Sequence, residues 1–280
     1  MSKKKNKSQH YVSAFYLYNF TNCEQRKFSN KNKRKTKIWH YDKQKAFIKE
    51  RPIEKVATES YLFSFKKDDG EYDHSLDDKL VDVESRTTAS LDELCGIKAS
   101  LKKGSKAISL NDSIMDDILA FIAWQMKRHP TLVNDIHQQC EEWATKNASD
   151  LNPKEMALSV VEKIGKDNNY NFEDVLQKKN KVIFFTSNAL TSFITTDEPL
   201  VRFNKSSADG IGIEDTEIYF PLTSDMLLCM HGEGNRKEFR RENDRTFLRR
   251  FNNYVAKRAK RYIFGETEEQ VRRIVKDLRN

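Results

Sequence analysis

Hydrophobic residues recur every three or four positions between Asn111 and Pro130, which predicts one α-helix with defined ends. Asn111 or Ser113 can cap its first turn, and Pro130 ends the pattern. Gln125 falls on the apolar face of this helix, and Arg128 lies close to the same face. Because an unpaired polar group in a protein core costs free energy, both side chains must find polar partners inside the fold.

The same spacing predicts further helices along the chain. They cover residues 74–94, 132–146, 153–164, 244–261 and 266–278. In the first of these helices, Glu84 falls on the apolar side between Leu80 and Leu91. A carboxylate on a buried face is unusual unless it is paired. The polar segment 165–181 is expected to be a linker or an exposed loop.

Runs of aromatic and β-branched residues predict the strands, and a dense aromatic block at residues 10–20 is expected to be buried. The expected strands are 38–42, 46–48, 182–186, 192–196, 200–203, 217–222 and 226–230, and residues 60–65 are expected to form a further strand or a buried segment. Strands at both ends of the chain with helices between them predict an α+β fold, with a largely antiparallel or mixed sheet and an inserted helical layer. We expect one domain over residues 10–280, preceded by a disordered basic tail at residues 1–9.

The charge of the chain is unevenly distributed, although its net value is only +8 over 280 residues. Residues 1–37 carry +10, residues 236–280 carry +8, and the segment between them carries −10. One interpretation is that the basic ends are simply solvated. The other is a basic surface that faces nucleic acid, which requires the two ends to meet in space.

Several protein classes are excluded by what the sequence lacks. It has no apolar run of about 18 residues and no apolar segment behind its N-terminal lysines, so we expect a cytoplasmic protein without a membrane span. The four cysteines are far apart and are expected to be free thiols rather than zinc ligands or disulfides. No phosphate-binding loop, dinucleotide fingerprint, zinc-protease motif or nucleophile elbow is present.

The candidate chemistry rests on polar residues in apolar settings. The set consists of His10, Glu84, Gln125, Arg128 and Asp197. A histidine with two carboxylates can bind a divalent metal, here Mg²⁺ or Mn²⁺ on Glu84 and Asp197, or divide acid and base roles. An amide and an arginine can hold a phosphate. The competing interpretation is a buried structural network, in which Arg128 pairs with Glu84, His10 is a packed histidine and Asp197 caps a turn before Pro199.

The same residues carry a resemblance to a known family. The segments are HYVSAFYLYNF at 10–20, IWHYD at 38–42, VE at 83–84, QMKRHP at 125–130, FITTDEP at 193–199 and PLT at 221–223. In this order they resemble the DUF4238 family, a bacterial group named as a domain of unknown function. Ser13 stands where the family has proline, and Thr196 where it has serine. The resemblance implies one domain over about residues 10–264 and supports grouping the five polar residues, but it supplies no reaction.

We therefore predict a cytosolic effector that acts on nucleic acid, a candidate metal-dependent nuclease with all five residues in its catalytic site. The basic ends would hold the nucleic-acid backbone. A role in bacterial defence, or as a toxin-like effector, is a hypothesis drawn from the kind of protein. One alternative is a non-catalytic module that binds nucleic acid or protein and has a structural polar core. Another is an enzyme for a small anionic substrate.

Overall fold

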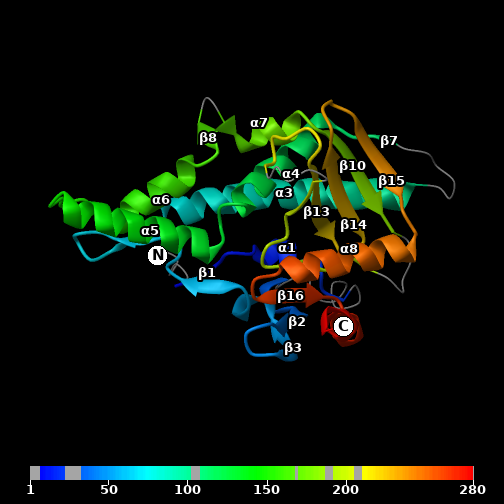
Figure 1. The fold of residues 1–280 in the computed structure, drawn as a ribbon, viewed down its shortest axis with the longest axis horizontal. Helices are drawn as coiled ribbons and strands as arrows, with labels where there is room; N and C mark the ends of the chain where they lie inside the picture. Colours follow the sequence, from blue (N-terminus) through cyan, green and yellow to red (C-terminus); the bar gives the residue numbers. More distant parts are fainter. Residues whose placement is uncertain are drawn as a thin grey trace.

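Two sheets and a layer of helices make up the protein, which is represented by a computed structural model (Figure 1). The structure describes residues 7–22, 33–101, 108–167, 170–186, 192–204 and 210–279. Helices from the middle of the chain cover one face of the larger sheet, and the smaller sheet lies on the other side of helix α8. This is the predicted single α+β domain with an inserted helical layer.

The larger sheet has six strands in the order β12-β13-β14-β10-β15-β7. Their bounds are Ile108–Ser109 (β7), Asn180–Phe185 (β10), Val201–Phe203 (β12), Glu217–Thr223 (β13), Met226–His231 (β14) and Lys237–Arg241 (β15). The β10–β15 pair is parallel and the other pairs are antiparallel, so the sheet is mixed. Strand β12 forms one edge of this sheet.

The smaller sheet joins the two ends of the chain. Its order is β11-β16-β2-β3, with bounds Thr195–Thr196 (β11), Tyr262–Gly265 (β16), Lys37–Asp42 (β2) and Phe47–Pro52 (β3). Strand β16 pairs antiparallel with β2, and helix α9 (Glu268–Arg279) packs on β2 and β3. The basic C-terminal segment therefore meets the chain where the basic N-terminal segment ends.

Three further sheets have two strands each. They pair Ser8–His10 (β1) with Thr58–Ser60 (β4), Phe65–Lys66 (β5) with Tyr72–Asp73 (β6), and Lys166–Asp167 (β8) with Tyr170–Asn171 (β9). Strand β1 begins inside the predicted N-terminal tail, because the Gln9 side chain is buried there. Its amide donates to the Ser64 hydroxyl and accepts from the backbone N–H of Phe63. Residues 1–6 lie outside the described part of the chain.

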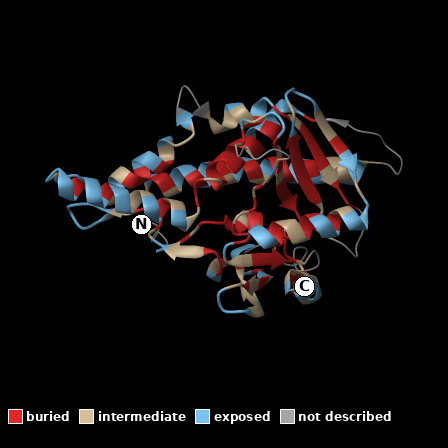
Figure 2. Cartoon of the chain, in the orientation of Figure 1, coloured by how far each residue is buried: buried red, intermediate tan, exposed pale blue. Residues whose placement is uncertain are grey.

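The helices are centred on α4, which is buried on all sides near its end. Their bounds are Ala14–Tyr18 (α1), Ser75–Ser100 (α3), Asp112–Gln125 (α4), Pro130–Lys146 (α5), Pro153–Lys163 (α6), Phe172–Gln177 (α7) and Arg245–Arg258 (α8), with 3-10 turns at Lys33–Lys35 and Ile53–Lys55. Every residue from Ile118 to Gln125 is buried (Figure 2). Asn111 caps α4 by accepting from the backbone N–H of Ser113, as predicted.

The aromatic block at the N-terminus fills the space between the helices and both sheets. Tyr16 of α1 is fully buried, and its ring packs on Phe20, Phe121 and Phe220. Its hydroxyl donates to the backbone carbonyl of Pro221 at 2.7 Å and lies 2.7 Å from the hydroxyl of Thr195. One side chain therefore connects α1 to a strand of each main sheet.

Several predicted boundaries differ from the structure. Helix α4 ends at Gln125 and not at Pro130, because Pro130 opens α5 behind the His129 cap. Segment 165–181 is not a simple linker, since it contains β8, β9, the short helix α7 and the start of β10. Strands β15 and β16 were not predicted. Strand β15 buries only one side chain, Phe239, between charged residues. Strand β16 follows α8 so closely in the sequence that it was not distinguished from the end of that helix.

The described residues test two further predictions, the free cysteine thiols and the lack of a membrane-spanning helix. Cys95, Cys140 and Cys229 are free cysteines, and Cys23 lies outside the described residues. In the described ranges, no helix combines the length and apolar character that crossing a bilayer requires.

We expect Tyr16→Phe to lower the free energy of unfolding by about 1–3 kcal/mol, because it removes two buried hydrogen bonds and keeps the ring. Urea unfolding measures this loss. Tyr41→Phe is the control, because the Tyr41 hydroxyl has no hydrogen bond within the described part of the chain and its removal should change stability by less than about 0.5 kcal/mol. Equal effects of the two changes would contradict the role given to Tyr16.

Candidate functional site

The Arg128 guanidinium is buried and donates through both terminal nitrogens, whereas its Nε has no hydrogen-bond partner in the described part of the chain. It follows α4, and its side chain is 4% exposed against 21% for Glu84. Its Nη1 donates to Glu84 Oε1 at 2.6 Å and to Ser13 Oγ at 2.5 Å, and its Nη2 donates to the backbone carbonyl of His10 at 2.7 Å. Ser13 Oγ also donates to Glu84 Oε1 at 2.7 Å. This network ties α3, the end of α4 and the N-terminal block together.

The His10 imidazole takes part in a backbone contact of its own. Its Nε2 lies 3.0 Å from the carbonyl oxygen of Ile53. Because a carbonyl oxygen only accepts, Nε2 carries the proton and donates it. Burial is the main cause that lowers the pKa of His10, so the ring is neutral at physiological pH. The ring is therefore a structural donor to the turn at residues 53–55.

The Gln125 amide points into a different region. Its Nε2 donates to the backbone carbonyl of Tyr11 at 2.8 Å. Its Oε1 is buried and has no hydrogen-bond partner in the described part of the chain. Unsatisfied buried acceptors are uncommon, and this one belongs to a residue that lines a cavity. The Gln125 amide oxygen is therefore an unsatisfied buried acceptor in a residue at the wall of this cavity.

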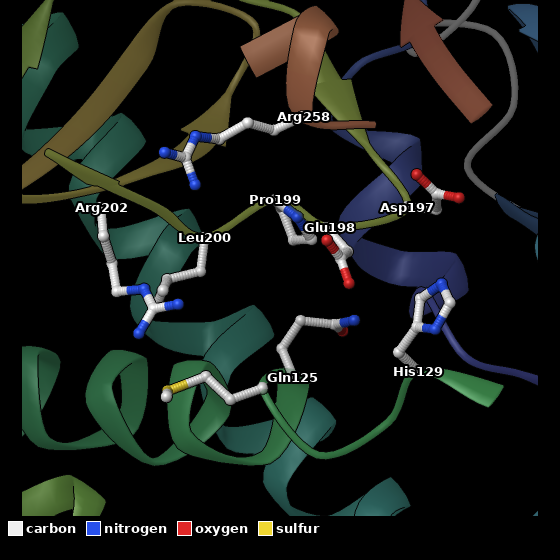
Figure 3. Close-up of a pocket in the computed structure, with 9 residues that line it drawn as sticks. Gln125, His129, Asp197, Glu198, Pro199, Leu200, Arg202 and Arg258 are labelled. Carbon is white, nitrogen blue, oxygen red and sulfur yellow. The ribbon is translucent and has the colours of Figure 1, made fainter. Parts of the chain in front are cut away.

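The Asp197 carboxylate fixes the turn that follows α8. Its Oδ1 accepts from the backbone N–H of Lys260 at 3.1 Å and its Oδ2 from that of Arg261 at 2.7 Å. The side chain is buried and points away from the cavity residues (Figure 3). Desolvation by burial raises the pKa of Asp197 to about 6, although the backbone N–H donors act in the opposite direction.

A cavity of about 310 Å³ lies between the end of α4, segment 197–202 and the end of α8. Its lining residues are Gln125, Met126, His129, Asp197, Glu198, Pro199, Leu200, Arg202 and Arg258. His129, Glu198 and Gln125 point toward one another from three separate segments, and the guanidinium groups of Arg202 and Arg258 lie at the opposite end (Figure 3). The volume is at the lower end of the range for small-molecule sites.

The titratable groups at one end of the cavity differ in charge state. His129 Nδ1 accepts from the backbone N–H of Thr131 at 3.2 Å, so in the neutral ring Nε2 carries the proton. Burial, followed by the charge of Lys260, lowers the pKa of His129. The Glu198 carboxylate forms an ion pair with Lys260 at 2.7 Å. A neutral imidazole N–H and a carboxylate therefore share one wall of the cavity.

The other end of the cavity is cationic. Arg258 lies with its guanidinium carbon 4.9 Å from the centre of the Tyr254 ring. Arg202 comes from strand β12. Lys260 pairs with Glu198, and the guanidinium groups of Arg202 and Arg258 line the opposite end of the cavity. The arrangement suits an anionic ligand that carries a hydroxyl or amide group.

The structure divides the five predicted residues into two sets. Glu84 and Arg128 form the buried network beside the His10 backbone, whereas Gln125 lines the cavity and Asp197 fixes one of its walls. The carboxylates of Glu84 and Asp197 are taken up by different hydrogen-bond partners and do not fit a shared Mg²⁺ or Mn²⁺ ion. No three His, Cys, Asp or Glu side chains in the described ranges are grouped as metal ligands.

Sequence reasoning missed four residues of this cavity. They are His129, Glu198, Arg202 and Arg258. The signal available was position, because His129 lies inside the QMKRHP segment and Glu198 inside FITTDEP. His129 follows Arg128 and Glu198 follows Asp197, and both of these preceding residues were predicted because they are polar residues in apolar segments. The two arginines belong to a chain with 50 lysines and arginines, so nothing in the sequence distinguishes them.

We expect Arg128→Ala to destabilise the protein by about 2–3 kcal/mol, because it leaves Glu84, Ser13 and the His10 carbonyl without their donor. The double change Arg128→Met with Glu84→Leu should recover part of this loss, since no unpaired charge remains. Urea unfolding of the two variants tests this. Arg273→Ala, which removes an exposed i,i+4 pair with Glu269, is the control and should cost under about 0.5 kcal/mol.

The pKa of Asp197 predicts a pH-dependent stability. Between pH 3.8 and about 6 the folded chain holds a proton that the unfolded chain has lost, so the free energy of unfolding falls as pH rises through this window. Asp197→Asn lacks this titration. The difference in stability between wild type and this variant should therefore fall by about 2 kcal/mol between pH 4 and pH 7. A difference that stays constant with pH would show that Asp197 has an ordinary pKa.

Comparison with known proteins identifies the family of the chain and leaves its activity open. No curated protein and no solved structure gives a significant match. The model of one protein family, described as "Protein of unknown function (DUF4238)", matches residues 8–269. The match covers β1, the Glu84–Arg128 network and the whole cavity. The chain therefore belongs to the DUF4238 family of proteins of unknown function.

Proposed function

We propose that the cavity binds a phosphate group of a nucleic acid and that the chain hydrolyses a phosphodiester there, as a nuclease. The observation that carries this proposal is the division of one cavity into a cationic end and an acid–base end (Figure 3). Two guanidinium groups at one end match the geometry and charge of a phosphate. A neutral imidazole, a carboxylate and an unpaired amide oxygen at the other end match a proton-transfer reaction.

The proposed reaction uses side chains of the chain alone. Arg202 and Arg258 bind the phosphate oxygens and stabilise the charge that develops on them. Gln125 Oε1 accepts a hydrogen bond from a water molecule, and the Glu198 carboxylate takes its proton as the water oxygen bonds to phosphorus. The bond from phosphorus to the leaving oxygen breaks, the neutral His129 Nε2–H donates a hydrogen bond to that oxygen, and Glu198 passes on to it the proton taken from water.

No step of this reaction passes through a metal ion. The sequence-based prediction of Mg²⁺ or Mn²⁺ rested on Glu84 and Asp197, and these carboxylates are used in separate structural contacts. The prediction is tested directly by comparing cleavage with added Mg²⁺, with added Mn²⁺ and with a chelator. Under the mechanism proposed here, the chelator leaves the rate unchanged.

The distribution of basic residues supports nucleic acid as the partner. Strand β16 pairs with β2, so the C-terminal segment meets the N-terminal part of the chain, which was the condition for one basic surface. Helix α8 carries Arg245, Arg249, Arg250, Lys257 and Arg258 and no acidic residue. Its last turn delivers Arg258 to the cavity. We further propose that this activity serves bacterial defence in the cytoplasm.

A second candidate function is a non-catalytic module with a structural polar core. The Arg128–Glu84 network favours it, because two of the five predicted residues serve packing rather than chemistry. The two functions differ in what Glu84→Ala does. In a nuclease whose site is the cavity, this variant melts at a lower temperature and still cleaves nucleic acid below that temperature. A binding module shows the same loss of stability and has no cleavage at any temperature.

We expect His129→Asn and Glu198→Gln to lower kcat for cleavage of single-stranded DNA or RNA by roughly 10²–10⁴-fold, with little change in melting temperature. Arg258→Gln should weaken substrate binding about 10- to 100-fold, because a charge-assisted contact to phosphate is lost. Arg245→Gln is the matched control, since Arg245 lies on the same helix and does not line the cavity. Gel-based cleavage and binding titrations measure both effects. If Arg245→Gln and Arg258→Gln behave alike, the cavity is not the phosphate site.

A further inference from the structure

A second hollow, of about 440 Å³, lies beside the cavity and has a different chemistry. It runs between helix α8 and the edge of the larger sheet, at strands β12 and β13. Five of its nine lining residues are aromatic, and the others are Arg250, Glu217, Asp244 and Thr246. We call it the aromatic groove and define it by Phe203, Tyr219, Phe247, Phe251, Tyr254 and Arg250.

The rings of the aromatic groove form two contacting groups. Phe203 meets Tyr254 edge-on with ring centres 6.1 Å apart, and Tyr219 meets Phe251 at 5.7 Å. Phe247 lies nearly parallel to Phe251 at 6.4 Å. Phe203 is 45% exposed, although it lies on a strand of the main sheet. A large exposed ring that extends an aromatic wall marks a binding surface more often than an isolated exposed residue does.

The aromatic groove is continuous with the cationic end of the cavity. Phe203 follows Arg202 in strand β12, and the Tyr254 hydroxyl donates to the backbone carbonyl of Arg202 at 2.8 Å. Arg258 lies over the ring of Tyr254, one helical turn further along α8. Tyr254 therefore forms a wall of the groove and supports an arginine of the cavity. A ligand whose anionic group lies between Arg202 and Arg258 would place its neighbouring part on these rings.

We propose that the aromatic groove stacks an unpaired base of a single-stranded nucleic acid whose phosphate lies in the cavity. The inference rests on the proposed function and names its substrate class. Aromatic side chains bind unpaired bases through stacking, without the need for a specific sequence, whereas bases of a duplex are not available for such contacts. Arg250 in the groove and Arg258 one turn beyond Tyr254 favour a polyanion over an apolar peptide as the occupant, although Glu217 and Asp244 also line the groove and β12 is an edge strand that a peptide could extend.

The experiment compares two single-stranded oligonucleotides by fluorescence anisotropy. One is a hexamer of thymidine and the other is an abasic hexamer with the same backbone, both linked by phosphorothioates that resist cleavage. Wild-type protein is expected to bind the thymidine hexamer about tenfold more tightly, the effect of stacking one base. Phe203→Ala should remove most of that tenfold difference and leave binding of the abasic hexamer unchanged.

Trp143→Ala is the matched control, because Trp143 is an aromatic residue of similar exposure, 47%, on helix α5. It should keep the tenfold preference, and circular dichroism checks that each variant is folded. Equal binding of the two hexamers to the wild type, or a preference that survives Phe203→Ala, would overturn the base-stacking role and leave the phosphate site standing. If neither hexamer binds, both the groove's role and the proposed function are wrong. A double-stranded probe that binds as tightly as the thymidine hexamer would also overturn the inference.

Discussion

The contact between the end of α4 and the backbone of residues 10–13 is the constraint on which the site depends. Arg128 and Gln125 donate to the consecutive carbonyls of His10 and Tyr11, so two side chains one turn apart hold one short segment. His129 follows Arg128 directly, and its ring packs edge-on against Tyr11 at 5.7 Å. The floor of the cavity is therefore positioned by residues 10–13, which explains why the aromatic N-terminal block is so deeply buried.

The opposite wall depends on a similar use of backbone groups. Asp197 accepts from two consecutive N–H groups after α8, which fixes where that helix gives way to β16. This placement brings Lys260 to Glu198 and Arg258 to the cationic end of the cavity. Helix α8 thus reaches the cavity with its last turn and the aromatic groove with its middle. One helix therefore contributes side chains to both hollows.

Much of the fold was predictable, because a long periodic pattern of apolar residues indicates where a helix or strand lies. The cap at Asn111, the helices α5, α6 and α9 and the strands β10, β13 and β14 followed from such patterns. Strand β15 did not, because it buries only Phe239 among charged residues. The sequence also showed that Gln125, Arg128 and Glu84 need buried partners. It did not show which partners, because several are backbone carbonyls and amides, which every residue possesses.

This reliance on backbone partners changes how the family's motifs should be interpreted. Arg128 and Asp197 are buried residues that hold main chain in place, and each is followed by a cavity residue, His129 or Glu198. A substitution of Arg128 or Asp197 displaces its neighbour as well as weakening the fold, so it can abolish activity without the residue touching a substrate. Loss of activity alone therefore does not identify a catalytic residue here. A substitution at His129 or Glu198 that leaves stability unchanged does, because a loss of activity then cannot come from a weakened fold.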